Sequence, residues 1–364
     1  MAETFIEEAV GEMLMVGIAG TELTREEAAL FGKYRFGGVI LFQHNLRAPR
    51  QIYSLCRTLR ERAPADKPPL LAVDQEGGRV HRLPAPFTRF PPAAVVGRAA
   101  DPELAFAMGR ATARELNAVG INVNFAPVLD VLSSRANPVI GDRALSSDPA
   151  LVASLGWRIA EGLRSGGVIP CGKHFPGHGD TARDSHLELP VVARDARSLR
   201  ALELPPFVHA CARGIESLMT AHVVYPALDP DRPATLSRAI VTGLLRGELD
   251  YNGVVFTDDL EMSAISRYRD AGEAALAAVE AGADVLLFCH EIERALEAFD
   301  RLVDRAENDP GFESRVRESA ARIANLKRRS LKAFPAEDAF AELDLAAHRR
   351  IAQAITEACR RCTR

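Results

Sequence analysis

Short apolar runs recur along the chain, and each is followed by a stretch with the spacing of an amphipathic helix. The runs cover residues 13–18, 38–42, 70–73, 121–125, 167–171, 217–221, 253–257 and 283–288. They are continuous rather than alternating, which is typical of strands that are covered on both faces. Strand-then-helix units repeated in this way predict an α/β fold, a (β/α)8 TIM barrel. The alternative is an open doubly wound sheet, but Gly17-Ile18-Ala19-Gly20 after the first run lacks the glycine spacing of that fold.

Capping residues mark where several of these helices begin. Thr24 precedes an acidic first turn, and Asp101 and Asp148 each stand before a proline at the first helical position. After the last unit, helical spacing continues through residues 312–326, and another helical stretch covers 340–358. We therefore predict a barrel over residues 1–309 and a C-terminal helical extension, packed on the barrel, over residues 310–364.

Composition and charge narrow the class of protein. The chain has 364 residues, of which 47% are hydrophobic and 26% charged, as expected of a globular protein with a large core. A formal net charge of -4 argues against a nucleic-acid partner. The acidic N-terminus has no apolar segment behind it, and no apolar run approaches membrane-spanning length, so we expect a cytoplasmic protein without a membrane partner. The six cysteines are scattered, and the CxxC spacing of Cys359 and Cys362 has no second pair, which argues against a disulfide framework or a metal site.

The segment richest in chemically active side chains follows the fifth apolar run. Residues 173–186 read KHFPGHGDTARDSH and hold three histidines and two aspartates among glycines and a proline. Because such a composition does not suit a buried helix or strand, we predict a polar loop mounted on the end of a buried strand. Polar loops on rigid scaffolds are frequent positions of catalytic residues.

Other strand ends also carry charged or titratable residues. They are residues 74–82 after the third run, Asp130 and residues 141–143 after the fourth, His222 after the sixth, and Asp258 with Asp259 after the seventh. Carboxyl ends of barrel strands meet at one rim, and buried charge is costly unless it is paired or used. The tandem carboxylates are candidates for a nucleophile or general base, and the pattern does not decide which of them faces the barrel axis. Asp184 and His186 form a second candidate pair, in which the carboxylate orients the imidazole as a proton donor.

These segments resemble a known family. The stretch 173–180, continuing to Asp184-Ser185-His186, resembles the signature of the β-N-acetylhexosaminidases of glycoside hydrolase family 3. Residues 73–80, 124–130, 140–143 and 256–260 are similar to its other conserved blocks, in the same order. The resemblance implies that Asp258 is the catalytic nucleophile and that His186 is the general acid/base, with Asp184 as its partner. It also implies a set of residues that bind N-acetylglucosamine: Asp74, Arg82, Arg143, Lys173 and His174.

The activity implied is that of a retaining exo-β-N-acetylglucosaminidase, which removes terminal N-acetylglucosamine from muropeptide fragments during cell-wall recycling and needs no metal or cofactor. Its partner would be a small carbohydrate. Phosphorolysis is an alternative, because a neutral histidine does not repel phosphate as a carboxylate would. A metal-dependent hydrolase with ligands from positions 174, 178, 180, 184 and 186 is another, as is a sugar-binding protein without activity. With one tryptophan, Trp157, in a predicted helix, we expect recognition through charged and polar contacts.

Overall fold

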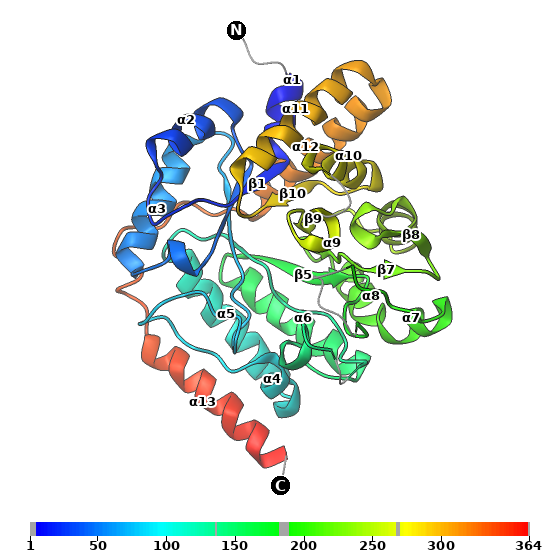
Figure 1. The fold of residues 1–364 in the computed structure, drawn as a ribbon. Coiled ribbons are helices and arrows are strands. Elements are labelled where there is room, and N and C mark those ends of the chain that lie inside the picture. Colours follow the sequence, from blue (N-terminus) through cyan, green and yellow to red (C-terminus); the bar gives the residue numbers. More distant parts are fainter. Residues whose placement is uncertain (1–4, 135–136, 182–188, 267–269, 363–364) are drawn as a thin grey trace.

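The computed structural model describes residues 5–134, 137–181, 189–266 and 270–362. In these residues eight parallel strands close a barrel in the order β1-β10-β9-β6-β5-β4-β3-β2, and helices surround it (Figure 1). The predicted TIM barrel is therefore confirmed. The barrel strands are β1 (Leu14–Val16), β2 (Gly38–Leu41), β3 (Leu70–Val73), β4 (Val123–Asn124), β5 (Ile169–Phe175), β6 (Ser217–Thr220), β9 (Val254–Asp259) and β10 (Val285–Phe288).

Each of these strands coincides with one of the predicted apolar runs, because each is buried between the barrel interior and the outer helices. Strands β5 and β9 extend beyond their predicted runs, and β9 reaches Asp259. Strand β5 continues through Lys173 and His174 to Phe175, where a polar loop was expected. Both polar side chains are buried within the strand because carboxylates from the segments after β3 and β4 pair with them.

The helices follow the strands as the periodicity predicted, and the three predicted caps are confirmed. Thr24 forms a capping box with Glu27, and Asp101 and Asp148 accept hydrogen bonds from the first-turn N–H groups of the helices that follow them. Each such cap contributes about 1 kcal/mol. The helices are α1 (Phe5–Glu12), α2 (Arg25–Tyr34), α3 (Pro49–Arg62), α4 (Ala93–Ala99), α5 (Pro102–Asn117), α6 (Pro149–Ser165), α7 (Ala196–Leu202), α8 (Pro205–Ala212), α9 (Ser263–Ser266), α10 (Ala271–Ala281), α11 (Ile292–Asn308), α12 (Pro310–Ser330) and α13 (Leu345–Cys362).

Shorter elements complete the chain. A small antiparallel pair, β7 (Val224–Tyr225) with β8 (Asp229–Pro233), stands outside the barrel after β6. The remaining segments are helical turns: η1 (Gln43–Asn45), η2 (Gly141–Arg143), η3 (Ala234–Leu236) and the π-helical η4 (Ala239–Glu248).

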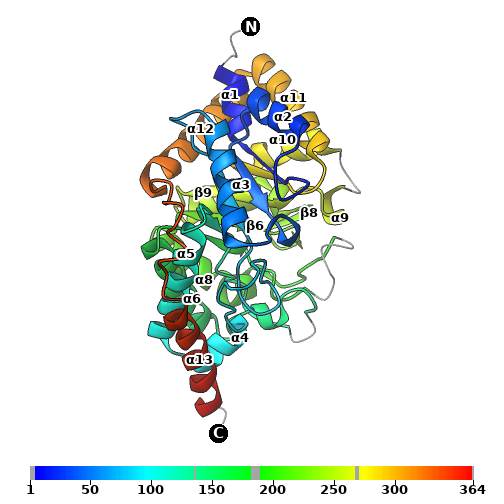
Figure 2. The same cartoon turned by 90° about the vertical axis from the view of Figure 1, so that its left-hand side faces the viewer.

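The two C-terminal helices pack on different parts of the barrel. Helix α12 contacts α1, α10 and α11, and its buried Lys327 Nζ lies 2.6 Å from Glu12 Oε2 of α1. Helix α13 runs along α4 and α5 on the outside of the molecule (Figure 1). Figure 2 shows α12 on the side of the molecule opposite α9, which follows the carboxyl end of β9. The proposed division at residue 310 stays a prediction.

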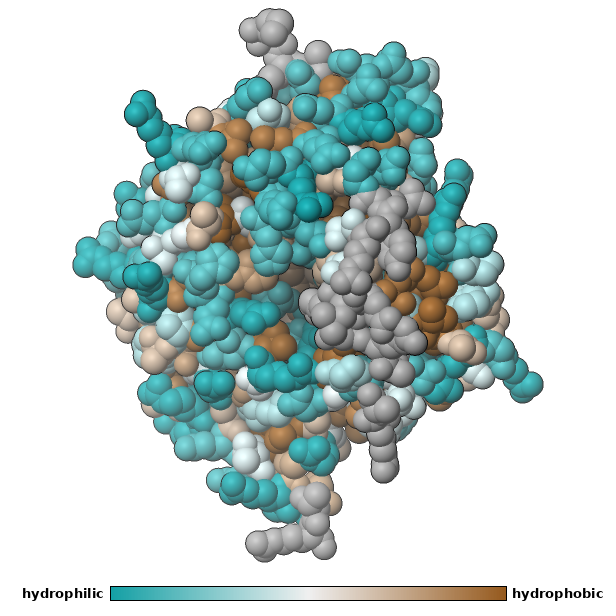
Figure 3. Space-filling view, viewed as in Figure 1, coloured by the Kyte–Doolittle hydropathy of each residue, from teal (hydrophilic) through white to brown (hydrophobic). Residues whose placement is uncertain are grey.

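The surface is mainly hydrophilic on the face seen in Figure 3, with hydrophobic residues gathered in limited areas. Among the described helices, none combines the length and the apolar composition that crossing a bilayer requires. No disulfide joins cysteines within the described residues, and Cys359 lies beside Arg98, whose Nε is 3.3 Å from its sulfur.

Candidate active site

A cavity of about 560 Å³ opens at the carboxyl ends of the barrel strands. The structure places six of the predicted site residues in its wall: Asp74, Arg82, Arg143, Lys173, His174 and Asp258. They come from segments up to about half the chain apart and meet because parallel strands of a barrel end at one rim. The other two predicted residues, Asp184 and His186, lie outside the described residues. Their roles, like those of the six, stay predictions.

Lys173 lies at the centre of the ion pairs in this cavity. Its side chain is 2% exposed, and its ammonium contacts Asp74 Oδ1 at 2.5 Å and Glu76 Oε1 at 2.7 Å. Burial by itself would lower the pKa of Lys173, but the two carboxylates outweigh burial and raise it. The lysine therefore stays charged at neutral pH and can donate hydrogen bonds to a bound oxygen.

Glu76 joins Lys173 to Arg143, and the sequence analysis had not assigned it a role. Arg143 grips the Glu76 carboxylate with two hydrogen bonds, from Nε at 2.9 Å and from a terminal nitrogen at 2.8 Å. Burial favours the neutral acid, yet the charges of Arg143 and Lys173 hold the pKa of Glu76 well below its usual range. The sequence feature that could have indicated Glu76 is its position two residues after Asp74, because this spacing places both side chains on one side of an extended segment.

Asp130 orients His174 at the end of β5 and His178 in the segment that follows. Its carboxylate accepts hydrogen bonds from His174 Nδ1 at 2.7 Å, from the His174 backbone at 3.0 Å and from the His178 backbone at 2.8 Å. Asp130 is fully buried, which opposes ionisation, but the histidines lower the pKa of its carboxyl. The sequence placed Asp130 at a strand end without giving it this positioning role.

The two tandem aspartates have different surroundings. Asp258 Oδ1 accepts a hydrogen bond from the Asp259 backbone at 2.9 Å. Burial acts to raise the pKa of Asp258, but the nearby His222 and His174 more than compensate, so the pKa is lowered. Burial instead raises the pKa of Asp259 to about 7. At neutral pH Asp258 is therefore more fully ionised than Asp259. The Asp259 carboxylate accepts hydrogen bonds from the backbone N–H groups of Glu261 and Cys289.

Arg82 offers a hydrogen-bond donor toward the cavity. Its backbone N–H is fixed by Gln75 Oε1 at 2.9 Å. Its Nε is buried, and no atom of the described residues accepts a hydrogen bond from it. An unsatisfied buried donor of this kind costs about 1–3 kcal/mol.

The loop beyond β5 is tightly seated, as far as the structure describes it. At Gly179 a side chain would collide with the carbonyl oxygen of Val131, since an ideal Cβ would lie 1.5 Å from it. Gly177 adopts φ = +134° and packs against Glu203, whose carboxylate accepts a hydrogen bond from Ser133 at 2.5 Å. Burial, opposed in part by Ser133, raises the pKa of Glu203 to about 7.

The side chains considered as metal ligands are engaged with protein groups. His174 binds Asp130, His178 Nδ1 lies 2.9 Å from the Thr181 hydroxyl, and Asp180 pairs with Arg194 at 2.8 Å. Within the described ranges, no cluster of three or more histidine, cysteine, aspartate or glutamate side chains has the arrangement of a metal site. Positions 184 and 186 of that hypothesis lie outside these ranges.

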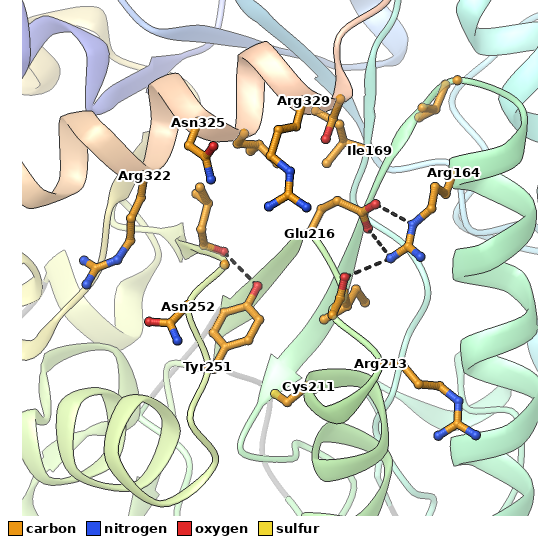
Figure 4. A pocket seen from close by; sticks show the side chains of 18 of the residues that line it. Arg164, Ile169, Cys211, Arg213, Glu216, Tyr251, Asn252, Arg322, Asn325 and Arg329 are labelled. Atoms are coloured by element: carbon orange, nitrogen blue, oxygen red, sulfur yellow. Dashed lines mark hydrogen bonds and ion pairs between the residues drawn. The ribbon is translucent and has the colours of Figure 1, made fainter.

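A second pocket, of about 660 Å³, lies at the other end of the barrel, where β5, β6 and β9 begin. In Figure 4, Arg164 and Glu216 point toward one another, and Arg322 and Arg329 reach in from α12. Two hydrogen bonds at 2.5 and 3.1 Å tie Arg164 to Glu216. Because functional residues of barrels gather at the carboxyl ends of strands, the cavity that contains Asp258 is the candidate active site.

Comparison with known proteins identifies related sequences. The N-terminal domain of glycosyl hydrolase family 3 matches residues 5–326. A protein named β-hexosaminidase from Alkalilimnicola ehrlichii is 43% identical over 298 residues, which span 80% of this chain and 84% of that protein. A β-hexosaminidase from Pseudomonas aeruginosa is 41% identical over 79% of this chain and 86% of its own length.

Solved structures of similar fold carry related descriptions. A family 3 β-N-acetylglucosaminidase from a Paenibacillus species has a TM-score of 0.91 and 41% identity, covering 98% of this chain and 69% of that one. NagZ from Neisseria gonorrhoeae, solved in complex with N-trifluoroacetyl-D-glucosamine, has a TM-score of 0.80 and 33% identity, covering 94% of this chain and 98% of that one. Another structure of the same NagZ is a complex with a zinc ion.

Proposed function

The chain belongs to glycosyl hydrolase family 3 and to its β-hexosaminidases, and from this premise we propose that it is a retaining exo-β-N-acetylglucosaminidase. The proposed substrates are muropeptide fragments from cell-wall recycling in the cytoplasm, and the released product is their terminal N-acetylglucosamine. The observation that carries the proposal is a lowered-pKa carboxylate, Asp258, in one cavity with a cluster of paired charged groups suited to hold a sugar.

The proposed mechanism is a double displacement. Asp258 attacks the anomeric carbon while His186 protonates the departing oxygen, which gives a glycosyl-enzyme and a free leaving group. Water, activated by the now neutral His186, then opens the glycosyl-enzyme and regenerates both residues. Asp184 holds the imidazole of His186 in the orientation needed for both steps.

The residues proposed to contact the sugar include both cationic donors and an anionic acceptor. Lys173, Arg143 and Arg82 donate to hydroxyl and carbonyl oxygens, whereas Asp74 accepts from a hydroxyl. The carboxylates of Asp74 and Glu76 keep the lysine charged and fix its direction. Groups that are already fixed before the substrate arrives do not have to reorganise in the transition state.

Trapping the covalent intermediate tests this proposal. A 5-fluoro-N-acetylglucosaminyl fluoride slows the second step, so the intermediate accumulates, and peptide mapping then locates the sugar. We expect the label on Asp258 and none in an Asp258→Asn variant. Label on another residue, or turnover without a covalent intermediate, would overturn the proposed mechanism. Adding inorganic phosphate to the untrapped reaction tests the alternative, since phosphorolysis gives N-acetylglucosamine 1-phosphate.

A further inference from the structure

The cavity has two chemically different sides. The charged residues proposed to hold the sugar come from the ends of β3 and β5 and from the segment after β4. On the other side, Phe42 follows β2 and His290 follows β10. Strand β1 lies between β2 and β10 in the barrel. In the described chain the segment after β1 adds no residue to the cavity wall, and Phe42 and His290 are the aromatic side chains of that side, beside Ile40, Leu287 and Cys289.

Phe42 and His290 lie close enough to act as one aromatic surface. Their ring centroids are 5.5 Å apart and their planes are inclined by 26°. The Phe42 ring also stacks with His44, at 6.0 Å and 6°. Phe42 is half-buried against the hydrophobic core, and the His290 side chain is 63% exposed. We call Phe42 and His290 together the aromatic shelf.

The backbone under Phe42 is held rigidly. Asn45, which is fully buried, accepts a hydrogen bond from the Phe42 N–H at 2.8 Å. Its amide donates to the carbonyl oxygens of Ile18 and Gly20 at 3.0 and 2.8 Å. A single side chain therefore links the segments after β1 and β2 and fixes the position of the Phe42 ring.

The other half of the shelf is fixed to the strand that carries Asp258. Glu261, three residues further along, accepts hydrogen bonds from the backbone N–H groups of His290 and Glu291 at 2.6 and 2.9 Å. Asp259 accepts one from Cys289 at 3.3 Å, and its other oxygen lies 3.6 Å from His290 Nε2. The shelf is thus positioned relative to the proposed nucleophile by direct contacts.

We infer that the aromatic shelf binds the leaving group of the substrate, as a second pyranose ring whose C–H face packs against Phe42 and His290. This inference rests on the proposed function, because it needs a glycoside bound with its terminal sugar among the charged residues. The terminal sugar occupies the side of the cavity lined by the charged residues. The sugar ring on the other side of the scissile bond therefore faces the aromatic side. Aromatic walls with a few placed polar groups are typical of ligand sites. The sequence predicted recognition through charged and polar contacts. Under this inference that prediction applies to the terminal sugar only.

Comparing two substrates tests the shelf separately from the rest of the site. N,N′-diacetylchitobiose has a pyranose leaving group, whereas methyl β-N-acetylglucosaminide has none. For Phe42→Leu, which keeps an apolar side chain but removes the aromatic face, we expect kcat/KM on the disaccharide to fall about tenfold. On the methyl glycoside it should stay within about twofold, because the terminal sugar site is intact. His290→Ala should show the same selective loss.

Controls separate a local effect from a loss of folding. His290 is exposed and its replacement removes no core packing, and activity of both variants on the methyl glycoside reports an intact fold. His209→Ala, at a partly buried histidine of α8 outside the cavity, should change neither rate. Equal losses on both substrates, or no loss on the disaccharide, would overturn the inference. Failure of the wild-type enzyme to release N-acetylglucosamine from either substrate would instead refute the proposed function, and the shelf with it.

Discussion

Replacing Glu76 by glutamine is predicted to destabilise the protein strongly, although no motif drew attention to this residue. The change keeps the volume of the side chain and removes its charge. Lys173 and Arg143 then lose the carboxylate that lies between them, at a position where the Glu76 side chain is 6% exposed. Removing one partner of a buried ion pair costs about 3–5 kcal/mol of unfolding free energy, because a buried charge is left unpaired.

The pH dependence of this loss has a definite sign. The pKa of Glu76 is lower in the folded protein than in the unfolded chain, where it is about 4.3. Its stabilisation is therefore fully present above about pH 4.3 and is lost as the pH falls toward the folded-state pKa. The difference between wild type and Glu76→Gln should be largest near neutral pH and shrink in acid.

Urea unfolding of wild type and variant at about pH 7 and about pH 3 measures this difference. Glu61→Gln is a matched control, because Glu61 pairs with Arg57 on the exposed face of α3 at 3.0 Å and should cost about 0.5 kcal/mol or less. A double-mutant cycle with Lys173→Met should give a coupling energy of about 1 kcal/mol or more. A loss below about 1 kcal/mol at neutral pH would refute the reasoning, since it would mean that water replaces the missing carboxylate.

Four further predictions follow from the site. Asp258→Asn should lower kcat about 10³-fold or more, while Asp259→Asn should stay within about tenfold, as steady-state rates on one substrate will show. Asp130→Asn should lower kcat/KM by about 10- to 100-fold because His174 loses its orienting partner, with a parallel rise in the inhibition constant of free N-acetylglucosamine; an unchanged constant would contradict this. Between about pH 4.5 and about pH 7 the unfolded chain loses the protons of Glu203 and Asp259 that the folded protein retains, so stability should fall as the pH rises, and Glu203→Gln should make this fall shallower by about 1.4 kcal/mol per pH unit; unfolding at several pH values decides. Exhaustive chelation should leave activity unchanged, and activity lost on chelation and restored by zinc would favour the metal-dependent alternative.

The barrel itself could be predicted from the sequence because its physical requirement is simple. A strand covered on both faces must be apolar along its whole length, so the run from 283 to 288 and its counterparts are visible without any knowledge of neighbours. Helix starts were visible for a similar reason, since Asp101 and Asp148 act within their own turn. Both features depend on residues that are close together in the sequence, and this is why the sequence shows them.

The polar end of β5 could not be predicted in this way. Lys173 and His174 look unsuited to a buried strand, and what makes them suited is a pair of carboxylates some 99 and 44 residues away, Asp74 and Asp130. Glu76 was missed for the same reason, because its partners Lys173 and Arg143 lie in distant segments of the chain. Phe42 and His290 were overlooked because neither belongs to a motif, and they meet only when the barrel closes.

The carboxylates at the rim differ in what they are already bound to, and this difference supports one assignment. Asp74 and Glu76 hold a buried lysine, Asp130 holds an imidazole, and Asp259 accepts backbone N–H groups. Asp258 accepts a single N–H, from the next residue, and none of the described side chains donates a hydrogen bond to its second oxygen. A nucleophile needs a charged oxygen that is not committed to a structural partner, and its lowered pKa keeps Asp258 charged. Alternation along the strand left open the choice between the tandem aspartates, and this difference in bonding and charge supports the proposal that Asp258 is the nucleophile.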